Sequence, residues 1–142
     1  MKIENDGVWM VVDDDKSILL LLDNLLKPFE SQRIEYHRSP HAALNAFEAC
    51  PGKYQFVVMD LEMPGMSGIE LCRRFWRLAP ALKILLMTGS GIITAGEADE
   101  IGFCGLLAKP FRFAAIRNAI VSAGILSVSQ KNFAQPMALT TA

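Results

Sequence analysis

The stretch from Phe56 to Gly68 constrains the fold more than any other part of this chain. It reads FVVMDLEMPGMSG: an apolar, β-branched run ends in one carboxylate, Asp60, and a proline and two glycines follow. The apolar run predicts a buried strand, and the proline and glycines predict a turn after it. Ser67 with Glu70 three residues later predicts a capping box that begins a helix. Asp60 would then lie at the carboxyl end of a strand, where α/β proteins bind ligands, although many Asp residues only cap helices or lie in loops.

The composition suits one globular domain. The chain has 142 residues, of which 51% are hydrophobic and 20% charged, and its formal net charge is −1. This balance favours a packed core and gives no electrostatic reason to expect a nucleic-acid or membrane partner. The N-terminus lacks the apolar core of a signal peptide, so we expect a cytoplasmic protein. The three cysteines, Cys50, Cys72 and Cys104, share no metal-ligand spacing, so we expect them to be buried thiols. His37 and His41 have no Cys or His partner nearby in the sequence, so we expect them at the surface.

Apolar runs alternate with helical patterns along the whole chain. The predicted strands are 8–12, 32–37, 56–60, 83–87 and 105–108. The predicted helices are 16–26, 40–49, 67–78, 94–101 and 111–123. Pro28 follows the first helix, Pro40 opens the second and Gly124 ends the last, which are positions that these residue types favour. The second strand is the most polar, so we expect it at an edge of the sheet.

Strands that alternate with helices predict an α/β fold with a parallel sheet covered on both faces. Right-handed crossovers leave few topologies, of which we choose a doubly wound five-stranded sheet in the order 2-1-3-4-5. The predicted domain covers residues 8–124, between an N-terminal extension, 1–7, and a C-terminal tail, 125–142. We expect the tail to be disordered. The alternative is a docking segment that uses Phe133, Met137 and Leu139.

Four of the five predicted strands end in a polar side chain that can do chemistry. The first strand leads to Asp13 and Asp14, the third to Asp60, the fourth to Thr88 and the fifth to Lys109. In a parallel sheet these ends share one edge, so the side chains should meet in one shallow cleft. Three carboxylates about 5 Å apart repel by roughly 3 kcal/mol per pair at an effective dielectric constant of 20. The sequence therefore predicts a bound cation.

The ligand types indicate which cation this is. Oxygen ligands without His or Cys favour Mg²⁺, with Mn²⁺ as the alternative, and Mg²⁺ commonly binds a few carboxylates together with a phosphate oxygen. Thr88 and Lys109 can supply a hydroxyl and a positive charge to a phosphoryl group. A carboxylate can act as a nucleophile and form an aspartyl phosphate. We therefore expect Mg²⁺-dependent phosphorylation of Asp60.

Four segments resemble the signature segments of response-regulator receiver domains, in residue type, order and spacing. They are Val11–Asp15, Val58–Gly68, Met87–Gly89 and Lys109–Phe111. The resemblance covers roughly Trp9 to Ala123 and implies a flavodoxin-like fold.

The resemblance also implies a role for each matching residue. Asp60 would be the phosphoacceptor, and Asp13 and Asp14 would bind Mg²⁺ together with Asp60 and the backbone carbonyl of Glu62. Thr88 and Lys109 would contact the phosphoryl group, and the Lys109–Pro110 bond would be cis. The partner would be a histidine kinase or a phosphotransfer protein in a two-component phosphorelay. We expect a receiver that stands alone and that assists its own phosphorylation without being an enzyme.

One residue departs from the family pattern. Leu106 stands three residues before Lys109, where the family usually has Tyr or Phe, so the aromatic half of the family's output switch is missing. A receiver-like scaffold that binds a partner without phosphorylation is therefore an alternative. A phosphatase of the haloacid-dehalogenase type is a second alternative, because it also uses an aspartyl nucleophile with Thr and Lys. In that family, however, the acidic pair follows the Lys, whereas here Asp13 and Asp14 precede Asp60.

Overall fold

The computed structural model describes residues 7–29 and 32–126. Its strands are β1 (Val8–Val12), β2 (Ile34–His37), β3 (Tyr54–Asp60), β4 (Lys83–Thr88) and β5 (Gly105–Ala108). They form one parallel sheet in the order β2-β1-β3-β4-β5, which confirms the predicted topology and the edge position of the second strand. All five residues of β1 are buried, as expected for a strand covered on both faces. The predicted tail lies outside the described residues, apart from its first two.

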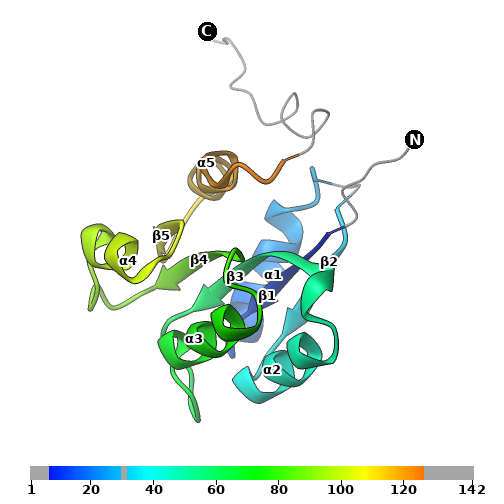
Figure 1. Cartoon of the computed structure of the whole chain (residues 1–142). Coiled ribbons are helices and arrows are strands. Elements are labelled where there is room, and N and C mark those ends of the chain that lie inside the picture. Colours follow the sequence, from blue (N-terminus) through cyan, green and yellow to red (C-terminus); the bar gives the residue numbers. More distant parts are fainter. Residues whose placement is uncertain (1–6, 30–31, 127–142) are drawn as a thin grey trace, which may run out of the picture.

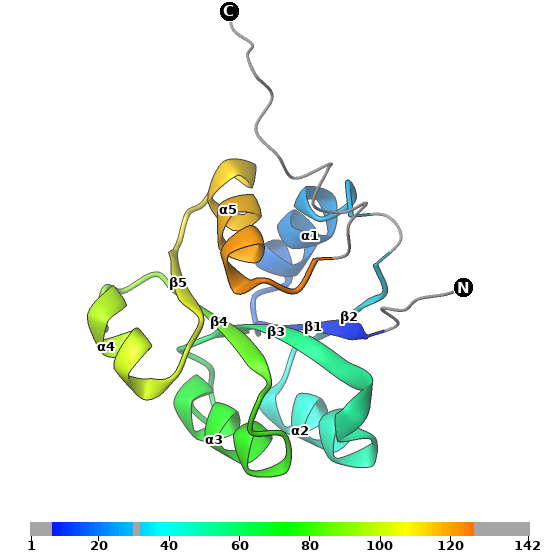
Figure 2. The same cartoon turned by 45° about the horizontal axis from the view of Figure 1, so that its top comes forward.

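The helices are α1 (Lys16–Leu25), α2 (Pro40–Ala49), α3 (Gly68–Leu78), α4 (Ala95–Ile101) and α5 (Phe113–Ala123), with a short 3-10 turn, η1 (Pro51–Lys53), before β3. Figures 1 and 2 show α1 and α5 together on one face of the sheet and α2 and α3 on the other, with α4 beside β5 at the edge. Within the described residues, no helix is both long and apolar enough to cross a bilayer.

Two apolar cores hold these layers together. On one face Phe47 of α2 stacks on Phe75 of α3, with ring centroids 4.1 Å apart. On the other face Trp9 of β1 meets Phe56 of β3 edge-on at 5.3 Å, below α1 and α5. Burying such large rings, together with the aliphatic residues around them, removes much apolar surface from water and stabilises the domain. The sheet is thereby packed on both faces, and the carboxyl ends of its strands lie along one edge.

Helix caps set where most of the helices begin. Side-chain oxygens of Asp15, Ser39 and Ser67 accept hydrogen bonds from backbone N–H groups in the first turns of α1, α2 and α3. The predicted capping box of α4 is confirmed, because Thr94 and Glu97 cap each other's backbone.

Some local predictions need correction. The Glu70 carboxylate does not complete a capping box with Ser67, because it pairs with Arg74 one turn later, at 3.0 Å. Helix α5 begins two residues later than predicted, after Arg112, which makes no side-chain cap. Of the cysteines, Cys72 is buried, whereas Cys104 is only half-buried and Cys50 is exposed, because it ends α2 at the surface. His37 is half-buried, with its ring 3.5 Å from Glu35.

Candidate functional site

The strand register brings the predicted site residues to one edge of the sheet. Val12 of β1 lies beside Met59 of β3, so the next residues, Asp13 and Asp60, become neighbours. Asp60 in turn pairs with Met87 of β4, and Thr88 lies beside Ala108, the last residue of β5. Thr88, the residue after Met87, therefore brings its hydroxyl to this edge, and Lys109, the residue after Ala108, brings its ammonium. The predicted convergence of strand ends is therefore present in the structure.

Lys109 bridges two carboxylates. Its Nζ lies 2.8 Å from Oδ2 of Asp13 and 3.3 Å from Oδ1 of Asp60. The Asp13 side chain is wholly buried and that of Asp60 is 4% exposed, whereas the Lys109 side chain is 18% exposed. Charges removed from water are costly unless they are paired, so Lys109 offsets part of the repulsion between these two carboxylates.

The third carboxylate, Asp14, reaches solvent beside this pair. One oxygen from each of Asp13, Asp14 and Asp60 lies within 4.8 Å of the others. Oxygen ligands at this separation suit a hard divalent cation such as Mg²⁺ or Mn²⁺. The donor set of this chain therefore fits such an ion, with Lys109 supplying only part of the positive charge that the cluster needs.

The electrostatic environment raises the pKa of Asp60 to about 6, first because the carboxyl is buried and second because Asp13 repels its charge. Lys109 lowers that pKa but does not overcome these effects. For Lys109 itself, burial lowers the pKa, but hydrogen bonds and attraction from Asp13 and Asp60 outweigh burial and hold it above its ordinary value. The ammonium is therefore charged throughout the neutral range, whereas burial and repulsion from Asp13 disfavour the charge on Asp60.

Thr88 is buried at the end of β4, and its hydroxyl has a partner that sequence reasoning missed. Its Oγ1 lies 3.3 Å from Oγ of Ser90 and also accepts from the Ser90 backbone N–H. A hydroxyl two residues after a strand-ending Thr is a weak signal, because only the tight turn after β4 brings the two oxygens together.

Glu62 and Leu106 lie outside the cluster of Asp13, Asp60 and Lys109. The Glu62 side chain is exposed, and it lines a neighbouring groove. Leu106 is half-buried on β5 and packs against the core that β3, β4 and α4 share. The Lys109–Pro110 peptide bond is cis, as the resemblance implied.

Gly68 lets α3 begin directly against the end of β3. Its backbone N–H donates to the carbonyl of Leu61 at 3.0 Å. A Cβ at this position would overlap with the carbonyl oxygen of Asp60 and crowd the backbone of Leu61. Backbone atoms cannot rotate away from such a contact as a flexible side chain can, so only glycine permits this approach.

We therefore expect Gly68→Ala to lower the free energy of unfolding by about 1–3 kcal/mol, as overpacking does in rigid surroundings. The matched control is Gly52→Ala, because a Cβ there meets nothing within 4 Å. Urea unfolding of both variants measures the difference. Equal stability of the two variants would show that the β3–α3 turn yields more easily than its geometry indicates.

The strand order and the position of the site define the class of protein. The parallel sheet is that of a doubly wound α/β protein, and the acidic cluster lies at its switch point, where β1 and β3 end side by side. Within this class, the family model for the response regulator receiver domain matches residues 9–121. The chain belongs to this family, as the sequence predicted. This membership decides against the haloacid-dehalogenase alternative.

Relatives of known description agree with this assignment. The chain is 34% identical over 111 residues to the transcriptional regulatory protein FixJ of Azorhizobium caulinodans. The matched region is 78% of this chain and 51% of FixJ. It is 28% identical to sporulation initiation phosphotransferase F of Bacillus subtilis over 112 residues, 78% of this chain and 88% of that one. The response regulator protein TmoT of Ectopseudomonas mendocina is 31% identical, with 90% of this chain and 57% of TmoT covered.

Solved structures show the same fold. The crystal structure titled FixJ-N matches with a TM-score of 0.71 and 31% identity, over 88% of this chain and 98% of that chain. A response regulator receiver domain from Clostridium thermocellum matches with a TM-score of 0.74 and 24% identity, over 91% and 99% of the two chains. This chain spans about half the length of two of these relatives, FixJ and TmoT. Receiver domains, as a family, bind Mg²⁺ at an acidic pocket and interact with histidine kinases or phosphotransfer proteins.

Proposed function

We propose that this chain is a phosphoacceptor, and that it receives a phosphoryl group on Asp60 from a histidine kinase or phosphotransfer protein. The observation that carries the proposal is the placement of Asp60, a buried strand-end carboxylate within hydrogen-bonding distance of Lys109 and beside Asp13. A carboxylate whose charge is poorly stabilised is a better nucleophile than one fixed by several strong donors.

The reaction moves one phosphoryl group between two nucleophiles. A carboxylate oxygen of Asp60 attacks the phosphorus atom, and a new P–O bond forms. The P–N bond of the donor phosphohistidine breaks, and its electron pair stays on the imidazole nitrogen. Lys109 attracts the phosphoryl oxygens through its ammonium, and Thr88 donates its hydroxyl to one of them. The residues assist this transfer by charge and position, so the chain takes part in its own phosphorylation.

Asp13, Asp14, Asp60 and the backbone carbonyl of Glu62 would hold the divalent cation, Mg²⁺ or Mn²⁺. The fit rests on the three clustered carboxylates, which supply oxygen ligands of the right kind. When bound, the cation supplies positive charge that neutralises the carboxylates and the phosphoryl oxygens.

Incubation with acetyl phosphate and Mg²⁺ tests the proposal. We expect intact-mass spectrometry to show one added phosphoryl group on the native chain and none on Asp60→Asn, which keeps the size of the side chain and removes the nucleophile. Glu48→Gln, an exposed carboxyl on α2, is the matched control and should label like the native chain. Unchanged labelling of Asp60→Asn would contradict the assignment.

The alternative function is a scaffold that binds a partner without phosphorylation. The observation that favours it is Leu106, which packs half-buried against the core at the position of the family's aromatic switch residue. The same labelling experiment separates the two functions, because a scaffold of this kind would remain unlabelled although correctly folded.

Hydrolysis of the phosphorylated chain should depend little on Glu62. Its side chain lies on an exposed loop, so it is poorly fixed for orienting an attacking water, and orientation helps only when geometry is fixed. We expect Glu62→Gln to change the dephosphorylation rate by less than about tenfold, or roughly 1.4 kcal/mol in the barrier. Lys109→Ala should instead impair formation of the phosphorylated state. A phosphate-release time course measures the rate, and a hundredfold change in Glu62→Gln would assign this side chain a direct part in hydrolysis.

A further inference from the structure

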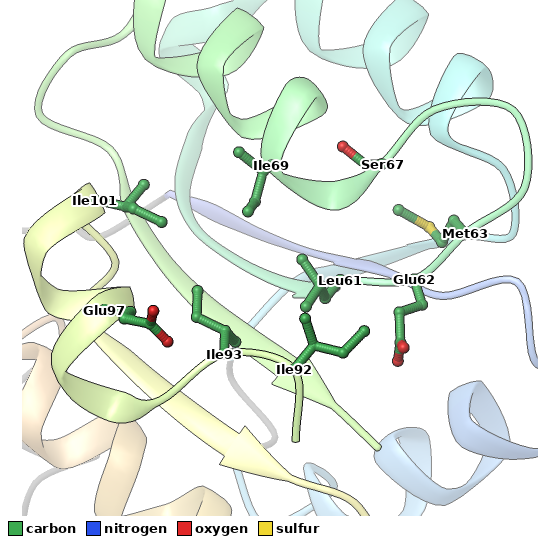
Figure 3. Close-up of a pocket in the computed structure, with 9 residues that line it drawn as sticks. All are labelled: Leu61, Glu62, Met63, Ser67, Ile69, Ile92, Ile93, Glu97 and Ile101. Atoms are coloured by element: carbon green, nitrogen blue, oxygen red, sulfur yellow. The ribbon is translucent and has the colours of Figure 1, made fainter. Parts of the chain in front are cut away.

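An apolar groove of about 460 Å³ lies between α3 and α4, beside the acidic site. Its lining comes from the loop after β3, the start of α3, the loop after β4, and α4. The lining residues are Leu61, Glu62, Met63, Ser67, Ile69, Ile92, Ile93, Glu97 and Ile101. Figure 3 shows Ile69 of α3 and Ile101 of α4 facing each other, with Leu61 and Ile93 below them on the neighbouring loops. Six of these nine side chains are apolar, so the groove offers an apolar floor and walls.

Ile92 stands at the mouth of this groove and is 70% exposed, more than any other large apolar side chain among the described residues. It follows Gly91, whose φ of +71° places it in the left-handed region, so the backbone turns sharply just before Ile92. Ile93, the next residue, is buried in the shared core. An isolated exposed isoleucine needs no explanation, but one that extends an apolar groove enlarges a surface that a partner could cover.

The charged side chains that line the groove have one sign. Its described lining includes two carboxylates, Glu62 and Glu97, and no basic side chain. Two further exposed acids, Asp99 and Glu100, lie on α4, and residues 89–105 contain no Lys or Arg at all. One oxygen of Glu97 accepts from the backbone of Thr94, which leaves its second oxygen available to a partner. Such a rim attracts cations and repels acidic segments over a Debye length of about 8 Å.

We propose that this groove binds an amphipathic helix of a partner protein, with apolar residues at i, i+3, i+4 and i+7 and Lys or Arg along both sides. The space between two helices suits a third helix that lays its apolar face into the groove. The seven residues of α4 extend about 10 Å, which matches two turns of such a helix. The acidic rim selects basic flanks, because complementary charge fixes register and excludes acidic competitors.

The wall of the groove is connected to the acidic site through Ser90. The backbone N–H of Ile92 donates to Oγ of Ser90 at 3.3 Å, and that oxygen lies 3.3 Å from Oγ1 of Thr88. Docking itself does not require phosphorylation, so this proposal stands or fails separately from the function proposed for Asp60.

The test uses a fluorescent helical peptide of about 14 residues with Leu at i, i+3, i+4 and i+7 and Lys at the flanking positions. Its twin carries Glu in place of each Lys. Fluorescence anisotropy with the full chain should show saturable binding of the Lys peptide, at least tenfold weaker binding of the Glu twin, and weakening when salt rises from about 0.05 M to about 0.5 M. Amide shifts in NMR should concentrate at Leu61, Ile93 and Ile101. Shifts confined to α1 and α5, or equal binding of the twins, would overturn the proposal.

Two exposed apolar residues give matched variants. Ile92→Ser should weaken binding of the Lys peptide at least fivefold, and Val121→Ser, which removes an exposed apolar side chain from α5, should leave it unchanged. Because both side chains are exposed, neither variant should affect folding. An equal loss in both variants would contradict docking in the groove.

The peptide assay and sedimentation distinguish two other occupants of the groove. If the chain's own tail filled the groove, replacing Phe133, Met137 and Leu139 by serine would strengthen peptide binding severalfold. If a second copy filled it, sedimentation would show a concentration-dependent dimer that Ile92→Ser abolishes. Either result would overturn the proposal of a partner helix, and unchanged peptide binding with a monomeric chain supports it.

Discussion

Asp14→Ala is expected to abolish Mg²⁺ binding. The described residues offer three clustered carboxylates, and Mg²⁺ sites commonly have so few protein ligands that the loss of one is not compensated. Isothermal titration calorimetry measures the binding directly. The matched control is Asp15→Ala, which removes the neighbouring carboxylate. Asp15 caps α1 by accepting from Ser17 at 2.8 Å and does not belong to the cluster, so this variant should still bind Mg²⁺.

The same two variants should differ in the sign of their effect on stability. In chelator Asp14→Ala should be more stable than the native chain by about 1 kcal/mol, because it relieves repulsion from Asp13 and Asp60 that solvent already weakens. Asp15→Ala should be less stable by about 1 kcal/mol, because a helix cap is lost. Destabilisation of Asp14→Ala in chelator would show that its carboxylate is a structural group and not a metal ligand.

Asp60 is expected to make the free energy of unfolding fall as the pH rises. Its pKa rises on folding, from 3.8 to about 6, so the folded chain holds this proton more tightly than the unfolded chain. Its favourable contribution is fully present below about pH 4 and is lost as the pH rises through 6. In metal-free buffer the loss amounts to roughly 3 kcal/mol. Asp60→Asn cannot ionise and should therefore be the more stable chain at pH 7.5.

Urea unfolding of both chains in chelator, between pH 4 and pH 7.5, measures this difference. Glu35→Gln provides a control, because the pH dependence that Glu35 gives to the stability has the opposite sign. Burial raises the pKa of Glu35, but hydrogen bonds from Lys53, Tyr54 and His37 outweigh burial and hold that pKa below its ordinary value. Its stabilising contribution is therefore present above the unfolded pKa and lost on acidification. If Asp60→Asn were less stable than the native chain at pH 7.5, the Asp60 carboxylate would be favourably paired and not strained.

The sequence predicted those features that depend on local pattern and on strand order. Continuous apolar runs indicated β1 and β3, and the rule that parallel strands end at one edge predicted that Asp13, Asp60 and Lys109 lie together. The predicted family followed from the same residues. These features could be predicted because each depends on residue type at a strand end and not on how side chains pack.

Features that depend on competing side chains could not be predicted. Glu70 had two partners available within one helical turn, and it pairs with Arg74 instead of completing the cap at Ser67. The Thr88–Ser90 contact depends on the path of the turn after β4. The groove beside Ile92 arises only when segments from four parts of the chain pack together. For the Thr88–Ser90 contact and for the groove, tertiary geometry decides, whereas for Glu70 two local partners that the sequence allows equally compete.

The central claim, that Asp60 carries the phosphoryl group, is tested most directly by trapping the product. Borohydride reduces an acyl phosphate to an alcohol, so a phosphorylated aspartate becomes homoserine, and peptide mapping then locates the changed residue. After treatment with acetyl phosphate and Mg²⁺, we predict homoserine at position 60 alone, and none when the donor is omitted. Homoserine at position 13 or 14, or an unreduced chain that nevertheless carries phosphate on another residue type, would contradict the account.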